Sequence, residues 1–120
     1  MLKKEIYLVE ENEDPIATFE LQTTKPYWYN TNWFTVPDGP SLYLFHMAVL
    51  PAHQKRAVGR GVMEKIESIA RERGFRAVRL DAYAAAAGAG AFYSKCGYKL
   101  VFTGSFNGVS LAYYEKHVSD

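Results

Sequence analysis

The sequence has little cysteine and no excess of charge of either sign. Its 120 residues include one cysteine, Cys96, which has no partner for an intramolecular disulfide and so favours a reducing, cytoplasmic location. The formal net charge of +1 argues against a general nucleic-acid-binding protein, which usually carries a strong basic excess. No apolar run approaches the roughly 18 residues of a membrane span, and the first residues do not resemble a secretory signal. We therefore expect a soluble protein with neither a nucleic acid nor a membrane as partner.

Motifs for metals and for nucleoside triphosphates are also missing. His46, His53 and His117 have no metal-ligand spacing among themselves or with Cys96, so no metal site is expected. The chain has no Gly-Lys-Ser or Gly-Lys-Thr triplet, which excludes a Walker phosphate loop. Cys96 falls in a predicted helix, where a lone cysteine is more often a small apolar filler than a reactive thiol.

The residues that are present indicate one folded domain over residues 1–120, because hydrophobic residues make up 48% of the chain. Alternating apolar side chains predict a hairpin over about residues 6–21 and a third strand over residues 41–50. The period becomes helical from Val58 to a cap at Gly74, then returns to strand over residues 75–84. A short helix over residues 88–96 and a last strand pair over residues 98–102 and 109–114 follow. We predict an α+β fold of order β-β-β-α-β-α-β-β, with a mixed, mostly antiparallel sheet of about six strands and two helices.

An irregular aromatic segment, residues 27–34, separates the hairpin from the third strand. Such a segment either caps an edge of the core or lines a pocket, and the sequence leaves both open.

The junction between the third strand and the first helix is suited to an anion. The apolar strand runs through Val49 and Pro51 into a cationic turn that opens the helix. At a helix N-terminus the backbone N–H groups lack intrahelical acceptors, and the positive end of the dipole attracts phosphate. Lys55, Arg56 and Arg60 add positive charge at this turn.

Two segments carry a resemblance to a known family. The first is Gln54-Lys55-Arg56-Ala57-Val58-Gly59, preceded by Val49-Leu50-Pro51, and the second is Ala91-Phe92-Tyr93-Ser94-Lys95-Cys96-Gly97-Tyr98. The first resembles the loop Gln/Arg-x-x-Gly-x-Gly/Ala of the GNAT superfamily of acetyl-coenzyme A-dependent N-acetyltransferases, which follows a Val-x-Pro strand end. The second is similar to the ending of that family's last helix, Phe/Leu-Tyr-x-Lys-x-Gly-Phe/Tyr. With both motifs in the correct order, the resemblance extends from about Ile6 to Tyr114.

The resemblance implies a site for acetyl-coenzyme A. The pantetheine arm would pair with the backbone of Met47, Ala48 and Val49, and an N–H near Met47 or Ala48 would polarise the acetyl carbonyl. Tyr93 matches the family tyrosine that protonates or hydrogen-bonds the departing thiolate, and it is the predicted catalytic residue; the alternative is an ordinary aromatic packed on the sheet. The pyrophosphate would lie over Gln54, Lys55, Arg56, Ala57, Val58, Gly59 and Arg60.

The chain also departs from the family pattern. Ala57 replaces a glycine of the loop, used where backbone approaches the ligand closely or takes unusual dihedrals. Ala86 replaces an asparagine that bonds the pantetheine arm, so this contact is absent. The family's N-terminal strand and helices, which build one wall of the acceptor pocket, are missing, and that wall comes from residues 27–34, from a partner subunit or from nothing. An apolar groove left open in this way favours a homodimer.

No general base is evident on the third strand. The usual positions share the face of Met47 and are occupied by Tyr43 and Phe45, while strict alternation points His46 to the opposite face. Glu20, Asp81 and a chain of water molecules remain open as alternatives.

We therefore predict an N-acetyltransferase that moves an acetyl group from acetyl-coenzyme A to a primary amine of a small molecule or protein by direct attack. The alternative is a catalytically weak or silent coenzyme A-binding or regulatory module that needs a partner to complete its acceptor site. The aromatic segment permits a flat or cationic acceptor, which the sequence does not identify further.

Overall fold

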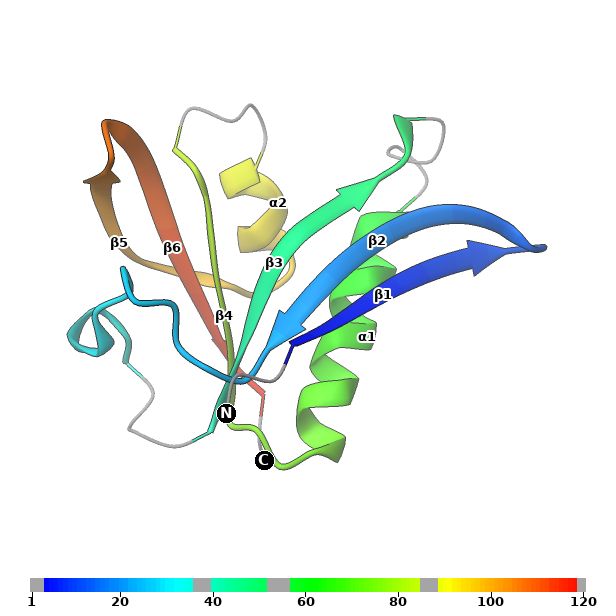
Figure 1. Ribbon diagram of the computed structural model, residues 1–120, viewed down its shortest axis with the longest axis horizontal. Helices are drawn as coiled ribbons and strands as arrows, with labels where there is room; N and C mark the ends of the chain where they lie inside the picture. The colour runs from blue at the N-terminus through cyan, green and yellow to red at the C-terminus, as the bar shows by residue number, and fades with distance from the viewer. Residues whose placement is uncertain (1–3, 36–39, 52–56, 85–88, 119–120) are drawn as a thin grey trace.

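The computed structural model describes residues 4–35, 40–51, 57–84 and 89–118. These residues form a six-stranded sheet with a long and a short α-helix (Figure 1). The predicted α+β class and order of elements are confirmed. No helix among the described residues is long and apolar enough to cross a bilayer. The elements are β1 (Lys4–Glu11), β2 (Asp14–Gln22), the 3-10 helix η1 (Thr31–Trp33), β3 (Ser41–Val49), α1 (Val58–Glu72), β4 (Ala77–Tyr83), α2 (Ala89–Lys95), β5 (Lys99–Phe106) and β6 (Val109–His117).

The strand order across the sheet is β1-β2-β3-β4-β6-β5. Every neighbouring pair is antiparallel except β3 and β4, which are parallel. A parallel pair needs a long crossover, and α1 supplies it between these two strands. The parallel pair therefore lies in the middle of the sheet, with an antiparallel hairpin on each side.

Both α-helices pack on one face of the sheet (Figure 1). The apolar residues of α1 recur at helical spacing, so they form a single stripe that is removed from water against the strands. Phe92 and Tyr93 of α2 pack against the same core. The largest fully buried side chains of this core are Phe19, Leu21, Leu42, Met63, Ile66, Val78 and Leu80.

The aromatic segment covers the opposite face of the sheet. Tyr29 is buried there and packs edge-to-face on Tyr43 and Tyr113, with ring centroids 5.7 and 5.2 Å away. Beneath the segment, Arg79 of β4 forms a buried ion pair with Glu115 of β6 at 3.1 Å. The segment thus caps the core, which is one of the two roles that its composition allowed.

A bulge at His46 changes which way the second half of β3 faces. His46 has a φ of +52°, and β3 pairs Phe45 with Glu20 but Ala48 with Thr18. Two residues of β3 therefore oppose one residue of β2, which shifts the alternation of side chains. Met47 packs on the α1 face, whereas Phe45 packs on the aromatic face. The prediction that Met47 shares a face with Tyr43 and Phe45 is wrong, because the bulge adds a residue that strict alternation does not count.

Each α-helix ends in a Schellman motif, and the cap predicted at Gly74 is confirmed. At the end of α2, the N–H of Gly97 bonds to the Ser94 carbonyl at 3.0 Å and that of Tyr98 bonds to the Tyr93 carbonyl at 2.9 Å. Gly97 has a φ of +91° and Gly74, after α1, has a φ of +80°. The motif brings the rings of Tyr98 and Tyr93 together, with centroids 6.1 Å apart.

Candidate active site where the parallel strands separate

The parallel strands separate halfway along their length. β3 and β4 pair from Ser41 with Ala77 to Leu44 with Leu80, and no further pair forms between the described parts of these strands. Beyond the paired stretch, the ribbons of β3 and β4 move apart and leave space between them for side chains or a ligand (Figure 1). A cleft of about 440 Å³ occupies this space, and the described residues that line it are Met47, Val49, Ala57, Gly59, Arg60, Phe92, Tyr93, Lys95 and Cys96.

The first cleft gathers most of the predicted site residues that the structure describes. Met47, Val49, Ala57, Gly59, Arg60 and Tyr93 all line it. Ala48 does not: it lies on the exposed side of β3, in register with Thr18 of β2. Val58, the first residue of α1, packs against the core instead of lining the cleft. Gln54, Lys55 and Arg56 lie outside the described residues, as does Ala86.

The cleft narrows where α1 begins. Ala57 caps this helix in the left-handed region, with a φ of +61°, which an L-residue with a Cβ adopts at a cost. Two residues later, a Cβ on Gly59 would lie 3.1 Å from the ring of Phe92. The lack of a Cβ at Gly59 therefore suits the close approach of α1 to Phe92 of α2, and its backbone angle is an ordinary one. At the mouth of the cleft, Arg60 and Lys95 supply positive charge.

Tyr93 of α2 lies where two clefts meet. It lines the first cleft and, together with Met47, also lines a second cleft of about 580 Å³. Burial, followed by the nearby acidic groups Cys96 and Asp81, raises the pKa of Tyr93. Its phenol therefore stays protonated at neutral pH, as a proton donor must.

The second cleft lies beside Trp28 of the aromatic segment. The strand residues that line it come mainly from the C-terminal parts of β3 and β4 and from the start of β6. Asp81 of β4 is its one carboxylate among the described lining residues. The Tyr29 hydroxyl donates a hydrogen bond to Asp81 Oδ2 at 2.8 Å, and the indole N–H of Trp28 donates to the same atom at 3.4 Å. The other described lining residues are Leu44, Phe45, His46, Met47, Ala82, Tyr83, Ala89, Tyr93, Phe106, Asn107, Val109 and Leu111.

The candidates for a general base fall in different places. Asp81 and His46 line the second cleft. Glu20 is buried in β2, bonded to Gln22, and lines neither cleft. Tyr43 accepts a hydrogen bond from Arg79 under the aromatic segment, also away from both clefts.

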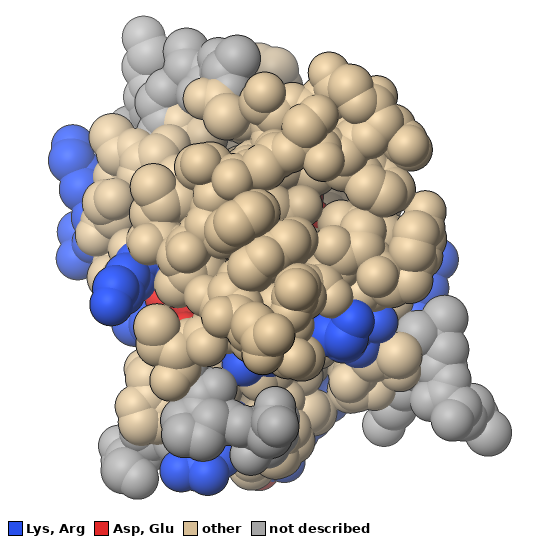
Figure 2. Space-filling model, turned by 90° about the vertical axis from the view of Figure 1, so that its left-hand side faces the viewer, with Lys and Arg blue, Asp and Glu red and all other residues tan. Residues whose placement is uncertain are grey.

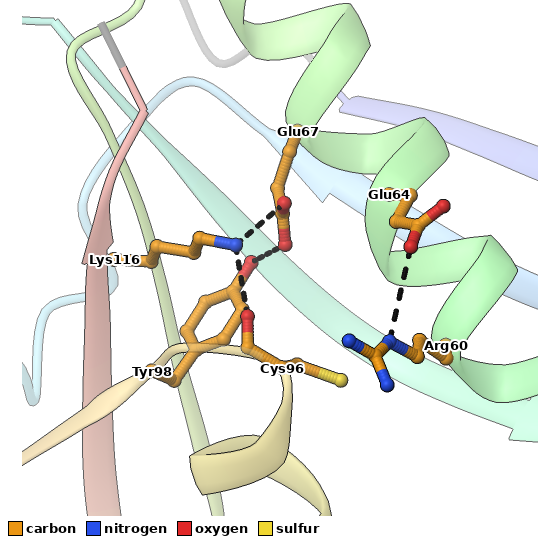
Figure 3. Close-up of polar contacts among 6 residues, drawn as sticks. All are labelled: Arg60, Glu64, Glu67, Cys96, Tyr98 and Lys116. Atoms are coloured by element: carbon orange, nitrogen blue, oxygen red, sulfur yellow. Dashed lines mark hydrogen bonds and ion pairs between the residues drawn. The ribbon is translucent and has the colours of Figure 1, made fainter.

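A buried polar cluster ties the cleft walls together (Figure 3). Glu67 of α1 accepts hydrogen bonds from Tyr98 at 3.0 Å and from Lys116 of β6 at 2.9 Å. Lys116 also donates to the Cys96 carbonyl at 2.8 Å, at the end of α2. Burial raises the pKa of the Cys96 thiol, so the group remains neutral at neutral pH. The described residues include no cluster of three or more side chains that could hold a metal ion.

Several lining residues escaped the sequence analysis. Phe92 and Lys95 stand inside the second motif, whose spacing along a helix could have placed them beside Tyr93. Trp28 lies in the aromatic segment, which was expected to cap the core or to line a pocket, and its members do both. Phe106 belongs to no sequence motif. It reaches the second cleft because it stands at the end of β5, next to the turn into β6.

Central parallel strands that separate beside a helix N-terminus, with Arg60 and Lys95 lining the cleft, fit the coenzyme A site of an acyltransferase that the sequence resemblance implies. The family model described as the acetyltransferase (GNAT) family matches residues 2–98, and the chain belongs to this family. It is thereby an acetyl-coenzyme A-dependent N-acetyltransferase. Among curated proteins, none matches the sequence significantly.

Solved structures share the fold at low sequence identity. A GNAT-family protein of Desulfovibrio desulfuricans is 18% identical with a TM-score of 0.74, over 96% of this chain and 69% of that one. The ribosomal-protein-S18-alanine N-acetyltransferase of Escherichia coli is 20% identical with a TM-score of 0.72, over 98% and 70%. A GNAT-family acetyltransferase of Elizabethkingia anophelis, solved with acetyl-coenzyme A bound, is 14% identical with a TM-score of 0.71, over 95% and 76%.

Proposed function

We propose that the protein transfers an acetyl group from acetyl-coenzyme A directly to a primary amine of a small molecule or protein, with the donor in the first cleft and the amine in the second. The observation that carries this proposal is that the two clefts share Met47 and Tyr93. An acetyl group held at this junction is open to an amine that enters from the other side. The reacting atoms then meet without a covalent enzyme intermediate.

The charges of the first cleft support its use by the phosphate groups of the donor. Arg60 and Lys95 line it together with Ala57 and Gly59 at the N-terminus of α1, where the first N–H groups of a helix have no intrahelical acceptor. We propose that Gln54, Lys55, Arg56, Ala57, Val58, Gly59 and Arg60 hold the pyrophosphate.

The backbone of β3 supplies the remaining part of the donor site. Past Leu44 the described part of β3 has no pair with β4, and we propose that a pantetheine arm lies alongside the backbone of Met47, Ala48 and Val49. A main-chain N–H at the His46 bulge, near Met47, would polarise the acetyl carbonyl and stabilise the charge that develops on its oxygen.

Tyr93 would complete the reaction. The nitrogen attacks the acetyl carbon, the C–S bond breaks, and the departing sulfur takes a proton from the Tyr93 hydroxyl. The raised pKa of Tyr93 keeps this proton in place until the sulfur needs it.

The test is release of coenzyme A thiol when the protein is given acetyl-coenzyme A and a panel of primary amines. Calorimetry with acetyl-coenzyme A alone measures donor binding separately. Arg60→Gln is expected to weaken donor binding several-fold, while Lys65→Gln, which removes one charge from the exposed side of the same helix, leaves it unchanged. Binding of the donor without thiol release from any amine would instead favour the silent coenzyme A-binding module.

We also propose that the protein is a cytoplasmic homodimer, formed along β5. This edge strand exposes Leu100 and Phe102, at 51% and 37% of their surface, and Val109 at the start of β6 is 42% exposed. Figure 2, seen from the β5 side, shows a broad uncharged surface with basic side chains at its rim. Light scattering of the wild type and of Leu100→Lys tests this: a dimer that the variant weakens is expected, and a wild type that stays monomeric at all concentrations contradicts it.

A further inference from the structure

The two clefts carry opposite charge. Among the described lining residues, the first cleft holds Arg60 and Lys95 and no carboxylate. The second holds the carboxylate of Asp81 and no lysine or arginine. A cationic cleft attracts the phosphates of the donor, so the anionic one is left for the opposite partner. An amine acceptor, which is mostly ammonium at neutral pH, has the complementary charge.

The carboxylate of Asp81 is held in a fixed orientation. Among the described residues, the Tyr29 hydroxyl at 2.8 Å and the Trp28 indole at 3.4 Å donate hydrogen bonds to it, both to its Oδ2 atom. Tyr29 is buried, and burial together with the Asp81 charge raises its pKa, so its hydroxyl remains a donor. Neither group bonds to Oδ1. The carboxylate is thus oriented from behind through one oxygen, and the other is left for a ligand.

Aromatic rings stand beside this carboxylate. Trp28 stacks on Phe106, with centroids 5.4 Å apart and planes inclined by 27°, and meets Phe45 edge-on at 6.4 Å. These three rings come from different elements and brace one another, so their faces are preorganised. Ring faces attract both cations and flat apolar groups. The volume of about 580 Å³ suits a small molecule or a single side chain.

We propose that the second cleft is the acceptor site, that Asp81 binds the acceptor's ammonium group, and that Trp28, Phe45 and Phe106 contact a flat or aromatic group attached to it. The acceptor class is therefore a primary amine with one positive charge and an aromatic substituent. This inference rests on the proposed function and deepens it. A diamine would bring a second positive charge into a cleft whose described lining includes no second carboxylate, so it binds less well.

In this proposal Asp81 also acts as the general base, for which the third strand offers no evident candidate. The ammonium gives one proton to Asp81, directly or through one water, and the freed lone pair forms the C–N bond with the acetyl carbon. The electrons of the C–S bond leave on sulfur, which takes the Tyr93 proton. The nitrogen's second proton returns to the Tyr93 oxygen, and Asp81 releases its proton to water. The products are a neutral amide, coenzyme A thiol and one proton.

The experiment is calorimetric titration of the full chain with 2-phenylethylamine, with 2-phenylethanol and with putrescine. We expect 2-phenylethylamine to bind at least tenfold more tightly than either of the other two, because only it has both the ring and a single charge. Asp81→Asn keeps an oxygen for Tyr29 but loses the charge. It is expected to weaken 2-phenylethylamine at least tenfold and to leave 2-phenylethanol and acetyl-coenzyme A unchanged. Glu72→Gln, at an exposed carboxylate at the end of α1, is the matched control and should change none of these affinities.

The inference is overturned if Asp81→Asn binds 2-phenylethylamine as the wild type does, or if putrescine binds more tightly than 2-phenylethylamine. Should Asp81→Asn fail to fold, the wild-type comparison of 2-phenylethylamine with 2-phenylethanol decides, and equal affinities overturn the inference. If coenzyme A thiol is released with other amines but not with 2-phenylethylamine, this inference is wrong and the proposed function still holds. Absence of both donor binding and thiol release sinks the proposed function itself.

Discussion

Tyr98 and Glu67 join the end of α2 to the middle of α1 by a buried hydrogen bond of 3.0 Å (Figure 3). Tyr98 directly follows Gly97, whose left-handed conformation ends α2, so the bond fixes where that helix stops. The two helices form opposite walls of the first cleft, which has Gly59 on one side and Phe92 on the other. The width of the cleft therefore depends on a polar contact away from its lining.

Removing this hydroxyl should destabilise the protein. Tyr98→Phe keeps the ring but takes one donor from the buried Glu67 carboxylate, and a bond to a charged group contributes about 1.5–3 kcal/mol. Lys116 remains bonded to Glu67, so we expect a loss near the lower end of that range. Urea unfolding measures it. Tyr83→Phe, at a residue that is 66% exposed, is the control, and an equal effect of the two substitutions would contradict the prediction.

Buried phenols should make the fold lose stability in alkali. Burial, followed by the charge of Glu67, raises the pKa of Tyr98 above its ordinary value of 10.0, and burial with Asp81 does the same for Tyr29. Above pH 10 the unfolded chain loses these protons and the folded chain keeps them, so the free energy of unfolding falls as pH rises. Below pH 10 the contribution is complete. Each such phenol contributes a slope of up to about 1.4 kcal/mol per pH unit.

Denaturant unfolding between pH 8 and pH 11 measures this slope. Tyr98→Phe removes one titrating group, so its decline above pH 10 should be shallower than that of the wild type. Tyr27→Phe, at a residue that is 81% exposed, should leave the slope unchanged. A free energy of unfolding that stays level up to pH 11 in the wild type contradicts the prediction.

The sequence predicts the order of elements and both helix ends, because these depend on local signals. The apolar period along α1 and the glycines at 74 and 97 each act within a few residues of where they stand. The first cleft is likewise formed by local segments: most of the lining that the structure describes comes from the two motifs and from the end of β3.

The residues that line the second cleft are far apart in the sequence, so sequence patterns did not predict that they come together. Trp28, Asp81 and Phe106 are far apart along the chain and meet only after the sheet is assembled. The bulge at His46 has no composition signal either, since neither glycine nor asparagine marks the positive φ. Because the sequence analysis did not predict this bulge, it placed Met47 on the wrong face of the sheet. The structure was needed to show that Met47 and Asp81 line a common cleft.

The left-handed cap at Ala57 should be improved by glycine. An L-residue pays about 1–2 kcal/mol for this conformation, and the greater freedom of glycine in the unfolded chain takes back about 0.5–1 kcal/mol. Ala57→Gly is therefore expected to raise the free energy of unfolding by about 0.5–1 kcal/mol. Lys65→Gly, in the middle of α1, should lower it by a similar amount. Chemical denaturation of both variants checks the opposite signs, and two losses would show that Ala57 is not strained.

Gly59 and Gly61 should respond differently to alanine. A Cβ at 59 would lie 3.1 Å from the Phe92 ring, whereas a Cβ at 61 has no heavy atom within 4 Å among the described residues. Gly59→Ala must push Phe92 and thereby change the donor cleft, so acetyl-coenzyme A should bind at least several-fold more weakly. Gly61→Ala should leave the affinity as it is. Calorimetry compares the two, and equal affinities would mean that Phe92 moves aside without cost.

Tyr93→Phe should separate chemistry from binding. The substitution removes only the hydroxyl, and the ring keeps its packing against Tyr98 and Tyr114, whose centroids lie 6.1 and 5.4 Å away. If Tyr93 donates the proton that the departing sulfur takes, kcat should fall by about 100-fold, since a positioned acid contributes at least that much. The dissociation constant of acetyl-coenzyme A should change by less than about twofold, because no phosphate contact is lost. Turnover that equals the wild type's would remove Tyr93 from the chemistry and leave Asp81 as the group that handles the proton.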